Sequence, residues 1–69
     1  MDTITTLRLF SDGRMSVHDT RALMVSMGHT SEDFAEAFAE LAGEEGASIR
    51  VGGYQSGESQ AELYLTAVR

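Results

Sequence analysis

Residues 31–42 read Ser-Glu-Asp-Phe-Ala-Glu-Ala-Phe-Ala-Glu-Leu-Ala, and the organisation of the chain can be worked out from this stretch. Its apolar residues recur three and four positions apart, which predicts a helix with one buried face. The residues of that face are Phe34, Ala37, Phe38 and Leu41. Thr30 or Ser31 can cap the helix, and Gly43 and Gly46 bracket its end, which could extend to Glu45.

The same stretch carries the net charge of the protein. Six acids and no Lys or Arg lie between residues 30 and 48, whereas the other five acids and five arginines cancel, so the formal charge is -6. The six acids are Glu32, Asp33, Glu36, Glu40, Glu44 and Glu45. Four of them recur every fourth residue and form one stripe, broadly opposite the apolar face. A solvated face is one interpretation, and an electronegative surface for a basic partner is the other.

The segments before this helix predict one strand and one further helix. Residues 3–10 are β-branched and aromatic and alternate at Thr5, Leu7 and Leu9, which predicts a strand. Residues 17–27 show apolar residues at helical spacing between a capping Ser16 and Gly28. Glycine is common just past a helix end, where the backbone turns left-handed, so this helix ends near residue 27.

The segments after it predict a hairpin. Residues 48–55 and 60–68 alternate in the strand period, and 56–59 form the turn. The predicted fold is therefore α+β, with a three-stranded antiparallel sheet, two helices packed on one face and the order β-α-α-β-β, in one domain over 1–69.

The predicted core residues are Leu7, Leu9, Ile49, Val51, Leu63 and Leu65 on the sheet and Leu23, Met24, Met27, Phe34, Phe38 and Leu41 on the helices. The outer sheet face would show Arg8, Arg50, Tyr54, Tyr64 and Thr66. Exposed tyrosines are frequent binding residues, so Tyr54 and Tyr64 join the six acids as candidate partner-binding residues.

The short link at residues 28–30 and the turn at 56–59 resemble those of a winged helix-turn-helix domain that lacks its first helix. The resemblance implies that the second helix of the pair enters the DNA major groove. Here that helix carries six acids, and phosphate neutralisation needs Lys or Arg. The charges therefore oppose direct DNA binding, and a winged-helix-like scaffold used for protein contacts is left as an alternative.

No residue pattern indicates an enzyme, a metal site or a cofactor. There is no cysteine, and His18 and His29 lie about 16 Å apart along the predicted helix. Residues 12–19 are similar to the second half of an EF-hand loop, but the first two ligand positions would be Arg8 and Phe10, which offer no oxygen. We expect no enzymatic activity, no metal and no cofactor.

The chain shows neither a signal peptide nor an apolar run of about 20 residues. We therefore expect a soluble, cytoplasmic protein, and it could be a monomer or a homodimer.

In size and acidity the chain resembles small phage-encoded inhibitors of bacterial defence, anti-CRISPR proteins among them. The resemblance implies a non-enzymatic inhibitor in the cytoplasm of a bacterial host. Its acidic helix would dock on a basic surface that otherwise holds nucleic acid. A winged-helix DNA-binding regulator and a small structural or dimerisation subunit are the alternatives.

Overall fold

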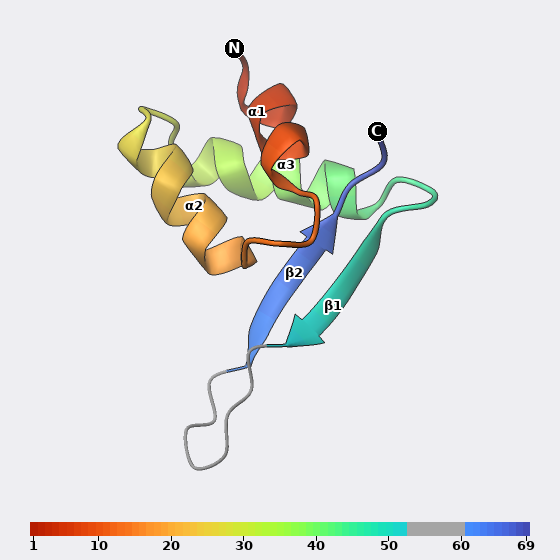
Figure 1. Cartoon of the computed structure of the whole chain (residues 1–69). Helices are drawn as coiled ribbons and strands as arrows, with labels where there is room; N and C mark the ends of the chain where they lie inside the picture. Colours follow the sequence, from red (N-terminus) through yellow and green to blue (C-terminus); the bar gives the residue numbers. More distant parts are fainter. Residues whose placement is uncertain (53–60) are drawn as a thin grey trace.

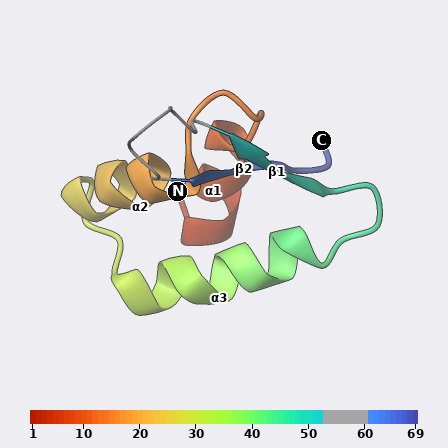
Figure 2. The ribbon, with the colours of Figure 1, turned by 90° about the horizontal axis from the view of Figure 1, so that it is seen from below.

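The computed structural model describes residues 1–52 and 61–69, which form three helices followed by a pair of antiparallel strands (Figure 1). The elements are α1 (Thr3–Phe10), α2 (Val17–Ser26), α3 (Ser31–Ala42), β1 (Ser48–Gly52) and β2 (Glu62–Thr66). Figure 2 shows α3 along one side of the molecule and the strand pair on the other. The α+β class holds, but the predicted three-stranded sheet with two helices is wrong.

The error lies in residues 3–10, which form α1 and not a strand. The Asp2 side chain caps this helix by accepting a hydrogen bond from the Thr5 backbone N–H at 3.0 Å. Ile4, Leu7 and Phe10 recur every third residue and pack on the core from one helical face. The alternation of Leu7 and Leu9 is therefore incidental, because a helix points residues two positions apart in different directions: Leu7 is 1% exposed and Leu9 is 53% exposed.

The other two helices match their predicted ranges and caps. The Ser16 and Thr30 side chains each accept a hydrogen bond from the backbone N–H three residues later, at 3.0 Å. α2 ends one residue before the predicted position, with Gly28 at φ +102°. The backbone N–H groups of Gly28 and His29 bond the carbonyls of Val25 and Met24, which satisfies the last turn.

The two strands lie within their predicted ranges of 48–55 and 60–68, but β2 begins after Ala61 and ends at Thr66, two residues before the predicted end. Arg50 pairs with Tyr64 and Val51 with Leu63, so the predicted faces of the two strands are confirmed. Residues 53–60, which include the predicted turn, lie outside the described residues. An isolated antiparallel bridge joins Asp12 to Thr66. Asp12, which follows α1, therefore lies beside β2 at the position where a third strand would pair.

The core lies where the three helices meet the inner face of β2. Its buried apolar residues are Leu7, Met24, Phe34, Ala37, Leu41, Leu65 and Ala67, with Phe38 partly buried beside them. Six predicted core residues are instead exposed, namely Leu9, Leu23, Met27, Ile49, Val51 and Leu63. Because residues 3–10 are not a strand, β1 pairs only with β2 among the described residues. The side chains of β1 are exposed, since no helix covers them.

Candidate protein-binding surface

Four of the six predicted acids form one exposed surface on α3, which we call the acidic surface: Glu32, Asp33, Glu36 and Glu40. α3 buries Phe34, Ala37 and Leu41 against the rest of the protein, chiefly against α1. At about 100° per residue, Glu32 and Glu36 project away from these three side chains, whereas Asp33 and Glu40 flank them. Helix geometry therefore gathers the carboxylates on the solvent side, as the sequence predicted.

The acidic surface borders a shallow hollow of about 270 Å³ between α3 and the beginning of α1. The residues that line it are Asp2, Thr3, Ile4, Asp33, Glu36, Ala37 and Glu40. Four carboxylates thus surround a space to which Ile4 and Ala37 contribute apolar contacts. A Lys or Arg side chain has matching chemistry, because it combines an apolar stem with a charged end.

Asp2 is a member of this site that the sequence interpretation missed, because residues 3–10 were assigned to a strand. Its carboxylate accepts hydrogen bonds from Thr5, which lower the pKa of Asp2 from its usual value. Asp2 is ionised at neutral pH even at its ordinary pKa of 3.8, and its charge adds to that of α3. The sequence signal was an Asp followed three residues later by a Thr at the beginning of a helical apolar pattern.

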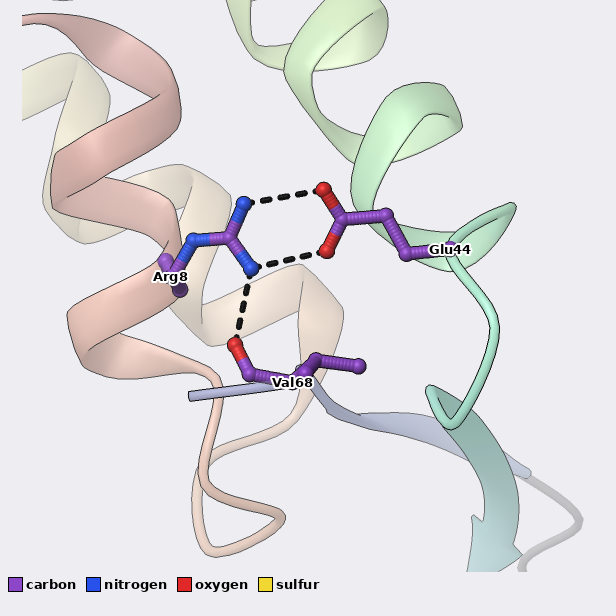
Figure 3. Close-up of polar contacts among 3 residues, drawn as sticks. All are labelled: Arg8, Glu44 and Val68. Atoms are coloured by element: carbon purple, nitrogen blue, oxygen red, sulfur yellow. Dashed lines mark hydrogen bonds and ion pairs between the residues drawn. The ribbon is translucent and has the colours of Figure 1, made fainter.

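Glu44 belongs to a different contact. Figure 3 shows its carboxylate facing the Arg8 guanidinium, which donates to Oε1 from Nη1 at 2.7 Å and to Oε2 from Nη2 at 2.9 Å. Nη1 also donates to the Val68 carbonyl at 2.7 Å. The hydrogen bonds from Arg8 lower the pKa of Glu44 and raise that of Arg8. This pair joins α1, the end of α3 and the C-terminal segment, so the Glu44 charge is neutralised within the molecule. The predicted placement of Arg8 on a sheet face is wrong, because α1 is a helix.

The remaining predicted residues do not join the acidic surface. Glu45 is exposed in the turn after α3. Tyr64 is half-buried on the other strand face, where the Arg50 guanidinium lies 4.2 Å from the centre of its ring. Tyr54 lies outside the described residues.

No salt bridge within the described part of the chain involves the acidic surface, although Arg8 attracts Glu40 at longer range. There, ion pairs join Arg8 to Glu44 and Arg14 to Asp12, and the four acids of α3 take part in neither. Their charges therefore remain directed at the solvent, where they attract cationic groups over about one Debye length.

Within 1–52 and 61–69 no group of three or more metal-binding side chains is placed to hold an ion. None of the helices described is both long enough and apolar enough to pass through a bilayer. Comparison with known protein families, with curated proteins and with solved structures finds no significant match to this chain.

Proposed function

We propose that this protein is a non-enzymatic binding protein whose acidic surface docks on a basic surface of a partner protein, one that otherwise holds nucleic acid. The observation that carries the proposal is the set of four exposed carboxylates on α3 that form no salt bridge with any described residue. The hollow beside them supports it, because a basic side chain fits both its charge and its apolar contacts.

The order of elements supports a winged-helix-like scaffold turned to this use. A helix, a bridging residue at Asp12, two helices and a strand pair follow one another along the chain. α1 supplies the first helix that the sequence resemblance lacked. In DNA-binding winged helices, the counterpart of α3 enters the major groove. The α3 acids would face phosphates there, so a DNA-binding regulator is disfavoured by repulsion.

The partner class follows from the chemistry of the surface. Proteins that hold nucleic acid present Lys and Arg in the positions that phosphates occupy, and a row of carboxylates can occupy the same positions. Inhibition of a bacterial nucleic-acid-guided defence complex in the host cytoplasm fits this mechanism and the small size of the chain.

Binding to purified CRISPR effector complexes, measured with and without bound target DNA, tests the proposal. We expect binding to a DNA-free complex that weakens between roughly 50 and 200 mM salt and is lost when target DNA is bound. The double substitution Glu36→Lys with Glu40→Lys should weaken it at least tenfold. As a control, Asp19→Lys changes the charge of an exposed residue on α2, and it should have less than a threefold effect.

Two results would contradict the proposal. One is unchanged affinity of the double variant, which would mean that the acidic surface only keeps the protein in solution. The other is a mobility shift of random duplex DNA by the wild-type protein near physiological salt, which would restore the DNA-binding alternative.

A further inference from the structure

The exposed surface of α3 has two sides of different chemistry. At about 100° per residue, Asp33, Glu36 and Glu40 lie on the side that meets the beginning of α1, where they line the hollow, and Glu32 lies between the two sides. The opposite side carries small and apolar residues. Its members are Ala35 and Ala39, which are exposed, and Phe38 and Ala42, which are half-buried.

The strand pair extends this apolar side. Leu65 is 2% exposed in the core, and Phe38 lines the same internal packing gap as Leu65. Strand residues two positions apart share a face, and cross-strand partners lie on the same face, so Leu63, Val51 and Ile49 continue the surface outward from Leu65. They are 44%, 64% and 46% exposed. The alanine side of α3 and these three residues together form what we call the apolar strip.

We propose that the apolar strip receives an amphipathic helix of the partner whose polar side is basic, so that this helix contacts the strip and the acidic surface together. The proposal deepens the function proposed above and rests on it. In an amphipathic partner helix, the apolar and the charged side chains lie about half a turn apart. α3 matches this arrangement, because it carries alanines on one exposed side and carboxylates on the other. The small alanine side chains also allow the close approach of a second helix axis, at 8–10 Å.

Charge complementarity selects this occupant over a second copy of the chain. A copy carries eleven acids against five arginines. Its described helices outside α3 contain one arginine each, Arg8 and Arg21, and Arg8 is already bonded to Glu44. A copy therefore brings no basic helix to the acidic surface and would repel it.

A pair of synthetic peptides separates the apolar contact from the charge contact. The first is an amphipathic helix of Leu and Lys, about 18 residues long or five turns. The second has the same composition with Leu and Lys strictly alternating, so it carries equal charge without a helical apolar side. Titration into the protein, monitored through its backbone amide NMR signals, reports both the Kd and the residues contacted.

The double substitution Val51→Ser with Leu63→Ser should raise the Kd of the amphipathic peptide at least tenfold and leave that of the alternating peptide within twofold. Val25→Ser with Met27→Ser is the matched control, because Val25 in α2 and Met27 just after it are similarly exposed, at 44% and 54%, and lie outside the strip. We expect less than a twofold change. The amphipathic peptide should shift the amide signals of Ile49, Leu63 and Ala39. Circular dichroism of each variant confirms that it is folded.

Three results would overturn the inference. The first is an unchanged Kd of the amphipathic peptide for the Val51 and Leu63 variant. The second is a set of amide shifts confined to the acidic surface. The third is a wild-type dimer in sedimentation that this variant converts to a monomer, which would make a second copy the occupant. Failure of the proposed function is distinct, since Glu36→Lys with Glu40→Lys would then leave the binding of both peptides unchanged.

Discussion

The pair of substitutions Leu7→Ala and Leu9→Ala tests whether residues 3–10 form a helix. A strand would place both leucines on one face with similar burial, whereas α1 buries Leu7 and exposes Leu9, at 1% and 53%. Truncation of a buried Leu to Ala costs about 2–5 kcal/mol, because the apolar contacts are lost and a cavity remains. Leu9→Ala removes only partly exposed methyl groups, and we expect less than about 1 kcal/mol.

The size of the larger effect makes the test decisive. A chain of this length has a total free energy of unfolding of about 3–10 kcal/mol. Leu7→Ala should therefore lower the Tm by at least about 8–16 °C, at 4–8 °C per kcal/mol, or leave the chain unfolded at 37 °C. Urea and thermal unfolding followed by circular dichroism measure both variants against the wild type. Equal losses for the two variants would refute the assignment of α1 and with it the contribution of Asp2 to the hollow.

Three further predictions concern caps and charges. Thr30→Ala removes the hydrogen bond at the beginning of α3 and should lower the free energy of unfolding, measured by urea denaturation, by about 1 kcal/mol. Thr30→Ser keeps a hydroxyl group at this position and should retain most of the stability. Gly28→Ala should cost about 1–2 kcal/mol, because φ is +102° there; no loss in thermal unfolding would contradict that backbone conformation. The pKa values of Asp2 and Glu44 are lowered in the folded protein, so both ionised carboxylates stabilise the fold. This stabilisation is complete above the ordinary pKa values of 3.8 and 4.5, and it is lost as the pH falls through the lower pKa values of the folded state. Denaturation as a function of pH should show stability declining below about pH 5, and Glu44→Gln should flatten that decline; an unchanged slope would show that the contact with Arg8 does not form in solution.

Local signals in the sequence were sufficient for α2, α3 and the strand pair. Ser16 and Thr30 mark the helix beginnings, Gly28 marks an end, and the alternation around Arg50 and Tyr64 sets the strand faces. Each of these features depends on hydrogen bonds or steric limits within a few residues, so the sequence alone fixes it. The stripe of Glu32, Glu36 and Glu40 is equally local, because a four-residue repeat on a helix places its side chains along one side whatever surrounds it.

The identity of residues 3–10 and the choice of buried residues needed the tertiary structure. β-branched residues fit either a helix or a strand, and the contact of Leu7 with the rest of the core selected the helix. Leu63 and Leu65 share a strand face, yet only Leu65 is buried, because the helices cover only part of that face. The pairing of Arg8 with Glu44 joins residues 36 positions apart. The sequence by itself determined which side chains share a face of α3, whereas the packing of α1 against it decided which charges remained available to a partner, since burial and ion pairing depend on what the folded chain brings alongside.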